Sequence, residues 1–276
     1  MTSPSTGAAA PEPHASRLST RGLRVGYDQR TIIPALDVAV PAGSFTVIVG
    51  PNACGKSTLL RSLARLLKPS AGSVLLDGGD IAKLPSKEVA KRIGLLPQTS
   101  IAPDGITVLD LVSRGRYPHQ TVLRQWSQAD EDAVQGALEA TTTAALASRF
   151  VDELSGGQRQ RVWVAMALAQ ETPMLLLDEP TTYLDIAHQV ELLDLFSHLN
   201  AQGRTLVAVL HDLNQAARYA THLIAMKDGR VVAEGPPEAV VTAELVEEVF
   251  GLPCLVIADP VSGTPLVIPR SARHRP

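Results

Sequence analysis

The sequence predicts an α/β fold with a mainly parallel sheet core, an antiparallel β portion before it and an α-helical portion inserted into it. Apolar runs at residues 44–50 and 174–180 are each followed by a helical pattern, the alternation expected of parallel strands joined by helical crossovers. Earlier segments alternate apolar and polar residues, as half-buried antiparallel strands do. Between about residues 107 and 147, Ala, Leu, Glu and Gln recur at helical spacing.

The first expected elements surround a glycine-rich turn. Two early segments alternate apolar and polar residues, whereas the run SFTVIVG is apolar enough for a fully buried strand. The segment KSTLLRSLARLL follows the turn with a helical pattern, and RIGLLPQ is a short apolar strand that ends at Gln98. The sequence therefore predicts strands at residues 23–27, 35–40, 44–50, 73–78 and 92–98 and a helix at residues 56–67.

The second half of the chain again places apolar runs before expected helices, at residues 174–180 and 205–212. Residues 222–235 contain Asp228 and Gly229, a dipeptide typical of a tight hairpin turn. Ligands of parallel sheets bind at the carboxyl ends of the strands. We therefore expect a site built from the polar residues at these ends, which are Lys56, Gln98, Asp178, Glu179 and His211.

Composition and pattern suggest how the chain is divided. Its 276 residues, 45% hydrophobic and 19% charged, suffice for a sizeable core. Residues 1–17 are expected to be a disordered leader, since they lack the cationic start and apolar stretch of a secretory signal. Residues 18–251 are expected to form the main domain, with the helical portion inserted at about 101–160. Residues 252–276 are expected to be an extension with short strands and a basic tip.

Charge and cysteine content exclude several classes of protein. The net charge is −3 and the charges are interspersed, which argues against a nucleic-acid partner because duplex-binding proteins concentrate Lys and Arg on one face. No apolar run approaches the roughly 20 residues that cross a bilayer as a helix. Cys54 and Cys254 lie far apart in the sequence, which fits a reducing compartment better than a disulfide framework.

The segment GPNACGKST matches the phosphate-loop pattern G-x-x-x-x-G-K-S/T, between an expected buried strand and an expected helix. Its backbone N–H groups can converge on phosphate oxygens, Lys56 can neutralise the β- and γ-phosphates, and the Ser57 hydroxyl can bind Mg²⁺. The alternative is a glycine turn before a helix with a surface lysine. The residues expected to bind the nucleotide here are Gly50, Pro51, Asn52, Ala53, Cys54, Gly55, Lys56, Ser57 and Thr58.

The segment MLLLDEP supplies acidic residues at the end of a second buried strand. Asp178 is expected to hold Mg²⁺ opposite the phosphate loop, and Glu179 is the candidate general base that polarises the attacking water. The alternative is a plain helix start, since acids and proline both favour the first turn.

A third motif, LSGGQRQR, precedes a long expected helix. Ser155, Gly156, Gly157 and Gln158 would place backbone N–H groups at a helix start, which is a second possible anion cradle. Taken alone the motif is also an ordinary cap and turn.

With the phosphate loop, LSGGQ and LLLDEP in this order, the chain resembles the nucleotide-binding subunits of ABC transporters, whose fold has a RecA-like core. The resemblance implies that two copies bind two ATP molecules head to tail, each LSGGQ segment closing on the other copy's nucleotide. It further implies that hydrolysis separates the copies and that the helical insert passes the motion to a permease.

The resemblance also suggests a role for individual residues, each with a plainer alternative. Tyr27 would stack on adenine or be a core aromatic of its strand, and Gln98 would sense Mg²⁺ and join the helical insert or be a solvated loop residue. His211 would contact the γ-phosphate or be structural, and Asp185 would contact the second copy or cap a helix. The implied catalytic residues are Glu179, His211, Gln98 and Lys56, and the implied Mg²⁺ ligands are Ser57, Gln98 and Asp178.

Further segments resemble the ATPases of ferric-siderophore importers, particularly the catecholate or enterobactin kind. This implies an integral-membrane permease as partner, a substrate-binding protein as indirect partner, and a peripheral position on the cytoplasmic face of the membrane. Related cassettes serve haem or cobalamin import, and others are cytosolic ATPases without a permease, so these remain alternatives. The segments are GRYPHQ at 115–120, residues 168–195, residues 211–235 and DPVSGTPLV at 259–267.

Two more distant classes fit less well, and one residue departs from the family. A non-hydrolysing regulatory module is opposed by Glu179, Gln98 and His211, and a GTPase or small-molecule kinase does not explain LSGGQ. Cys54 stands where relatives more often have Gly or Ser. It is either a tolerated variation or a target for oxidation or alkylation.

Overall fold

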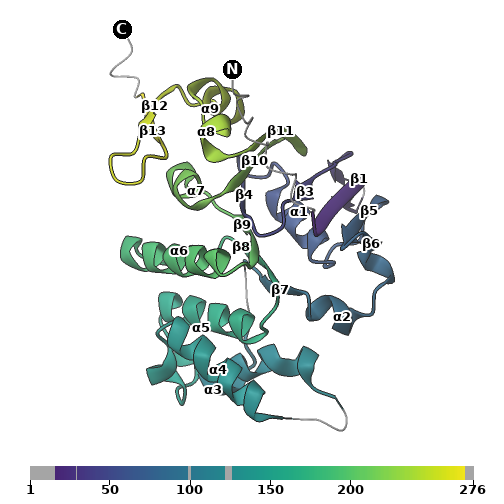
Figure 1. Cartoon of the computed structure of the whole chain (residues 1–276), viewed down its shortest axis with the longest axis vertical. Coiled ribbons are helices and arrows are strands. Elements are labelled where there is room, and N and C mark those ends of the chain that lie inside the picture. Colours follow the sequence, from purple (N-terminus) through teal and green to yellow (C-terminus); the bar gives the residue numbers. More distant parts are fainter. Residues whose placement is uncertain (1–15, 29, 99–100, 122–125, 271–276) are drawn as a thin grey trace, which may run out of the picture.

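The computed structural model describes residues 16–28, 30–98, 101–121 and 126–270. Its centre is a six-stranded sheet in the order β11-β10-β4-β9-β8-β7 (Figure 1). Five of these strands are parallel, and β11 closes one edge antiparallel to β10, so the predicted mainly parallel core is confirmed. The strands are β4 (Phe45–Val49), β7 (Ile93–Leu96), β8 (Met174–Asp178), β9 (Thr205–Val209), β10 (His222–Lys227) and β11 (Arg230–Gly235).

A second, antiparallel sheet lies beside this core, as predicted (Figure 1). The expected strand at residues 35–40 is wrong for most of its length, because only Ala39–Val40 pairs as β3. The Thr20 hydroxyl donates to the Leu36 carbonyl and accepts from the Val38 N–H, so a side chain takes up part of the bonding of a strand ladder there. Only two backbone bonds, from the Thr20 and Leu23 N–H groups to the Val38 and Leu36 carbonyls, accompany it. The sheet contains β1 (Leu18–Tyr27), β2 (Arg30–Ile33), β3, β5 (Ala71–Leu76) and β6 (Gly79–Asp80).

Helix α1 (Lys56–Leu63) ends one turn earlier than predicted. Arg65 adopts a left-handed backbone conformation with φ 61°, and its guanidinium donates to the Leu84 carbonyl at 2.7 Å. This side-chain anchor stabilises the turn, and Pro69 farther along could not continue a helix.

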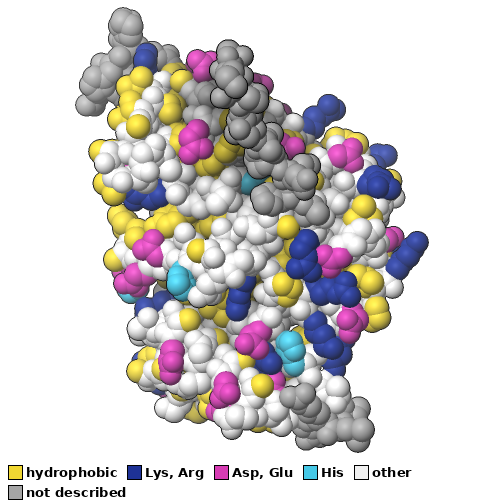
Figure 2. All heavy atoms as spheres, in the orientation of Figure 1, with side chains coloured by type: hydrophobic (Ala, Val, Ile, Leu, Met, Phe, Trp, Pro, Cys, Tyr) yellow, Lys and Arg dark blue, Asp and Glu magenta, His cyan; other side chains and the backbone are white. Residues whose placement is uncertain are grey.

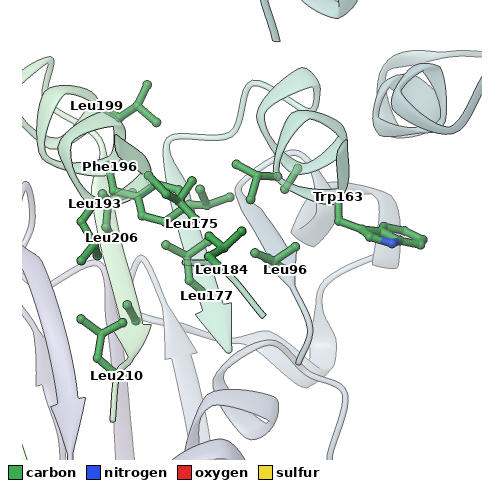
Figure 3. Packing of buried hydrophobic residues seen from close by; sticks show 14 of the residues in the cluster. Leu96, Trp163, Leu175, Leu177, Leu184, Leu193, Phe196, Leu199, Leu206 and Leu210 are labelled. Atoms are coloured by element: carbon green, nitrogen blue, oxygen red, sulfur yellow. The ribbon is translucent and has the colours of Figure 1, made fainter. Parts of the chain in front are cut away.

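Alternating side chains of the central strands divide the core into two clusters. Leu175 and Leu177 of β8 pack on one face with Phe196 of α6 (Ile186–Ala201), as Figure 3 shows. Met174 and Leu176 point to the other face, toward α1 and the antiparallel sheet. Both faces are covered, which explains why the strand sequences are apolar throughout.

The predicted helical insert forms the part of the molecule below the sheet in Figure 1. Helix α5 begins at the LSGGQ motif and returns the chain to the sheet at β8, and it packs against both α3 and α4. The elements are α3 (Val108–Ser113), η2 (Arg114–His119), α4 (Gln128–Ala140), η3 (Ala144–Leu146), η4 (Val151–Glu153) and α5 (Gly156–Ala169).

The buried side chain of Arg116 connects the helices of the insert. The Arg116 Nε donates to Asp130 Oδ1 at 2.8 Å, and its Nη1 donates to the Ala169 carbonyl at 2.7 Å and to Glu171 Oε2 at 2.8 Å. Asp130 also accepts from the Ser127 hydroxyl, and this bond and Arg116 lower the pKa of the Asp130 carboxyl. The GRYPHQ segment thus joins the start of α4 to the end of α5.

The last elements follow β9 and pack at the upper end of the molecule in Figure 1. The predicted hairpin is confirmed, with Asp228 and Gly229 both at positive φ in the turn between β10 and β11. Residues 1–15 and 271–276, where most of the leader and the basic tip were expected, lie outside the described residues, and the domain limits remain predictions. The elements are α7 (Leu213–Tyr219), α8 (Pro237–Val240), α9 (Ala243–Phe250), β12 (Cys254–Ala258) and β13 (Pro265–Pro269).

Within the described part of the chain, no helix has both the length and the apolar character needed to cross a bilayer.

We expect Arg116→Met to lower the free energy of unfolding by about 3–5 kcal/mol, because it leaves the buried Asp130 carboxylate without its cation. Urea denaturation followed by circular dichroism measures this. Arg149→Met is the matched control, since the Arg149–Glu153 pair is exposed in the same insert and should contribute less than about 1 kcal/mol. Equal losses in the two variants would contradict a structural role for the buried pair.

Candidate nucleotide site

A cleft of about 520 Å³ opens where the carboxyl ends of β4, β7, β8 and β9 meet the antiparallel sheet. It brings together residues that are far apart in the sequence and that were predicted to form one site. The residues that line it are Tyr27, Arg30, Ile32, Asn52, Ala53, Gly55, Lys56, Ser57, Thr58, Gln98, Glu179 and His211.

The phosphate loop leaves β4 in a path that requires glycine at Gly50 and favours it at Gly55. Gly50 has φ 152°, and a Cβ atom there would lie 2.2 Å from the Met226 carbonyl oxygen. Gly55 has φ 108°, which L side chains rarely adopt, and directly precedes α1. The loop therefore packs closely against β10 and leads directly into α1.

Lys56 is buried inside this loop. Its Nζ donates to the carbonyl oxygens of Gly50 and Pro51, both at 2.8 Å. The ammonium group is thus held at the entrance of α1 by oxygens of the loop itself. Phosphate oxygens can replace these neutral acceptors with charged ones, which form stronger hydrogen bonds.

Ser57 and Asp178 join the phosphate loop to β8. The Ser57 hydroxyl donates to Asp178 Oδ1 at 2.8 Å, whereas Asp178 Oδ2 is buried without a hydrogen bond, with Arg61 Nε 3.7 Å away. Burial raises the pKa of the Asp178 carboxyl. A hydroxyl oxygen and a carboxylate oxygen that accepts no hydrogen bond suit a hard cation such as Mg²⁺. In the described residues no three His, Cys, Asp or Glu side chains cluster as metal ligands, so such a cation would need further ligands from phosphate and water.

Glu179 lies between Gln98, which follows β7, and His211, which follows β9. Its Oε2 accepts from Gln98 Nε2 at 2.7 Å, and its Oε1 lies 2.7 Å from His211 Nε2. The backbone of Glu179 is left-handed, with φ 54°, which turns the chain out of β8 toward the cleft. The carboxylate is therefore fixed at both oxygens and faces the cleft next to the phosphate loop.

Tyr27 stands at the end of β1 on the rim of the cleft, with 42% of its surface exposed. This position opposes the alternative that Tyr27 is a core aromatic. Its ring can provide a flat apolar face for an adenine base.

The LSGGQ motif and Asp185 do not line the cleft of their own chain. The Ser155 hydroxyl accepts from the Gln158 N–H at 3.3 Å and Gln158 Oε1 accepts from the Ser155 N–H at 3.2 Å, which is a capping box at the start of α5. Asp185 caps α6 by accepting from the His188 N–H at 2.9 Å. Gly156 lies next to Ser155 in the same exposed helix start.

Cys54 is buried in the phosphate loop, and burial raises the pKa of its thiol. Both facts favour the alternative of a tolerated variation over that of an oxidation or alkylation target, because the thiolate is the reactive form.

Three contributions to the site were missed at the sequence level: Arg30 and Ile32 of β2, and Gly229 of the β10–β11 turn. The Gly229 N–H donates to the Cys54 carbonyl at 2.9 Å, and a Cβ atom at Gly229 would lie 2.0 Å from the Ile32 carbonyl oxygen. The dipeptide of the turn predicted a hairpin, but nothing in it signalled a contact with the phosphate loop.

Comparison with known proteins places these features in a family. Residues 33–182 match the model of the family described as ABC transporter. The chain is 59% identical over 255 residues to the probable siderophore transport system ATP-binding protein YusV of Bacillus subtilis, covering 92% of this chain and 93% of the relative. It is 58% identical over 255 residues to the ferric enterobactin transport ATP-binding protein FepC of Escherichia coli, covering 92% and 94%.

A solved structure described as an inward-facing conformation of a putative metal-chelate type ABC transporter has a similar fold. It superposes with a TM-score of 0.78 at 29% identity and covers 94% of this chain and 98% of its own. The predicted fold class is thereby confirmed.

We expect Asp178→Asn to raise the free energy of unfolding of the nucleotide-free protein at neutral pH by on the order of 1 kcal/mol. The raised pKa of this carboxyl means that burying its charged form is unfavourable. The protonated Asp178 carboxyl stabilises the folded parent protein fully at a pH below the pKa that this group has in the unfolded chain. That stabilisation is lost as pH rises through the higher pKa that the group has in the folded protein. The advantage of the variant should therefore appear as pH rises through the pKa of Asp178 in the folded protein.

Urea unfolding of both proteins without nucleotide or Mg²⁺, at a series of pH values, measures this difference. A variant that is less stable than the parent at every pH would show that the Ser57 bond outweighs the cost of burial.

Proposed function

Because the chain belongs to the ABC transporter family of ATP-binding, ATP-hydrolysing subunits, we propose that it energises the import of an iron–siderophore complex through a separate membrane permease. One observation carries the proposal. More than half of the aligned residues, over nearly the whole chain, are identical to those of two relatives named for siderophore and ferric enterobactin transport. Haem or cobalamin import and a cytosolic role without a permease remain the alternatives.

In the proposed mechanism the triphosphate of ATP enters the phosphate loop, where its oxygens replace the Gly50 and Pro51 carbonyls around Lys56. Tyr27 provides the face on which adenine stacks. Ser57, Asp178 and Gln98 would together hold Mg²⁺, which would neutralise charge that develops on the phosphates. The buried Asp178 Oδ2, which accepts no hydrogen bond, supports this assignment.

Glu179 is proposed as the general base. Gln98 and His211 hold its two oxygens at 2.7 Å, so the carboxylate is oriented before the substrate arrives. When the nucleotide binds, His211 can exchange this contact for the γ-phosphate, and the freed oxygen can accept a proton from the attacking water. A positioned base of this kind contributes about 10² to 10⁴ in rate.

A second copy of the chain is proposed to complete each site. Ser155, Gly156, Gly157 and Gln158 lie at an exposed or half-buried helix start outside their own cleft. Asp185 is exposed at the start of α6, so both segments are available to another chain. Tyr183 and Ile186, on either side of this aspartate, are 79% and 80% exposed. These two side chains would add an apolar contact to such an assembly.

The helical insert and the stretch after Gln98 are proposed to dock on an integral-membrane siderophore permease, which a substrate-binding protein supplies. The cassette would then lie peripherally on the cytoplasmic face of the membrane. Gln98 links the two parts, because it follows β7 of the sheet, bonds to the proposed base and leads into the insert. A change at the nucleotide can thereby move the docking surface.

We expect Glu179→Gln to bind ATP as tightly as the parent, to lose at least about 100-fold in turnover, and to accumulate as a dimer with ATP. Without a base the sandwich cannot hydrolyse the nucleotide that holds it together. Phosphate release and light scattering measure the two effects, and Glu238→Gln, an exposed glutamate of α8, is the control. Turnover at the parent rate would remove Glu179 from the role of base.

Deletion of the gene should abolish growth on a ferric siderophore as sole iron source while leaving growth on haem or inorganic iron unchanged. Complementation with the parent chain should restore growth, and complementation with Glu179→Gln should not. Co-purification with a permease on detergent extraction tests the partner. Unimpaired siderophore use, or loss of haem use alone, would overturn the proposed cargo.

A further inference from the structure

Basic side chains gather on one side of the molecule, over β5, β6 and α2 (Ser86–Ala90). Figure 2 shows several Lys and Arg side chains along the right-hand side of the molecule, with fewer Asp and Glu side chains among them. They come from two chain segments that the fold brings side by side: the turn after α1, and the stretch from η1 (Ile81–Lys83) through α2. We name the group formed by Arg65, Lys68, Lys83, Lys87 and Lys91 the basic face.

Nearby acids do not neutralise this face. Glu88 is shared by Lys91 at 3.6 Å and Arg92 at 3.9 Å, and Asp77 is shared by Arg17 at 2.8 Å and Arg92 at 3.4 Å. The Asp80 carboxylate accepts from the Ala82 N–H at the start of η1. Among the described residues Lys68 and Lys83 are exposed and have no ion-pair partner. The face is thus positive in a chain whose net charge is −3.

The basic face is hollowed and contains one prominent apolar side chain. A hollow of about 410 Å³ is lined by Lys68, Ser73 and one acid, Asp80, among others. A mainly apolar hollow of about 350 Å³ is lined by Leu66 and Ser86 among others, and both hollows share Arg65 as a wall. Bonds to the Ala82 and Leu84 carbonyls hold the Arg65 guanidinium between them. Leu66 is 63% exposed. Cations and hydroxyls around an apolar side chain match the phosphate and acyl ends of a lipid headgroup region.

We propose that the basic face binds the anionic phospholipid headgroups of the membrane in which the permease lies. The inference rests on the proposed function, because the face adjoins the proposed docking surface: Lys87 Nζ donates to the Gln120 carbonyl just after η2 and so holds α2 against the insert. Cytoplasmic loops of membrane proteins carry an excess of Lys and Arg and would repel this face. The anionic cytoplasmic leaflet attracts it. Contact with lipid keeps the cassette at the membrane when it binds the permease more weakly.

The test is co-sedimentation of the purified full chain with vesicles of phosphatidylcholine alone or mixed with phosphatidylglycerol, at low and high salt. We expect binding only to the anionic vesicles, weakened by salt. Lys68→Gln/Lys83→Gln should weaken it roughly 30-fold, since each lysine near an anionic surface contributes a factor of about five. The control Arg204→Gln/Arg270→Gln removes the same charge from the ends of α6 and β13 and should leave binding nearly unchanged.

ATP hydrolysis by all three proteins is measured on the same preparations, and neither pair of substitutions should alter it. Equal binding to neutral vesicles, equal losses in the two variants, or no binding by an actively hydrolysing parent chain would each overturn the proposal. The last outcome leaves the ATPase and its transport role intact, so the two hypotheses fail separately. Growth on a siderophore tests the transport role without any measurement of lipid binding.

Discussion

The hydrogen bond between Ser57 and Asp178 is the contact on which the site depends, because it joins the phosphate loop to the acidic end of β8. It spans two strands that are not adjacent, since β9 lies between β4 and β8 in the sheet. The first residues of α1 cross this gap. Any displacement of the helix from the sheet would therefore separate the residues proposed to bind phosphate from those proposed to face the attacking water.

The sheet core explains how such a contact is maintained. Side chains of β4, β8 and β9 alternate between two buried clusters, so these strands are fixed from both faces. On one face α1 is packed against the antiparallel sheet, and on the other α5 and α6 cover the strands. The helices of the insert are connected by the buried Arg116, which bonds to α4 and to the end of α5 and does not line the cleft. Arg116 thus fixes the helices of the insert to one another, while α5 also packs on the sheet.

Much of this could be predicted from the sequence because the signals are local. The phosphate loop, the acidic strand end and the Asp228–Gly229 turn each depend on a few adjacent residues whose backbone requirements are specific. What was missed depends on contacts between distant segments. The Thr20 hydroxyl replaces part of a strand ladder, Arg65 ends a helix early by reaching across to Leu84, and Gly229 supports the phosphate loop from another hairpin. The functional roles of the assembled residues remain predictions.

The two carbonyl contacts of Lys56 bear on the affinity of the proposed site. Carbonyl oxygens of its own loop hold the Nζ group, so the side chain already lies at the start of α1. If Lys56 binds phosphate as proposed, phosphate oxygens would compete with these carbonyls for the ammonium group. Each new bond would then replace an existing one, which would moderate the affinity for ADP as well as for ATP.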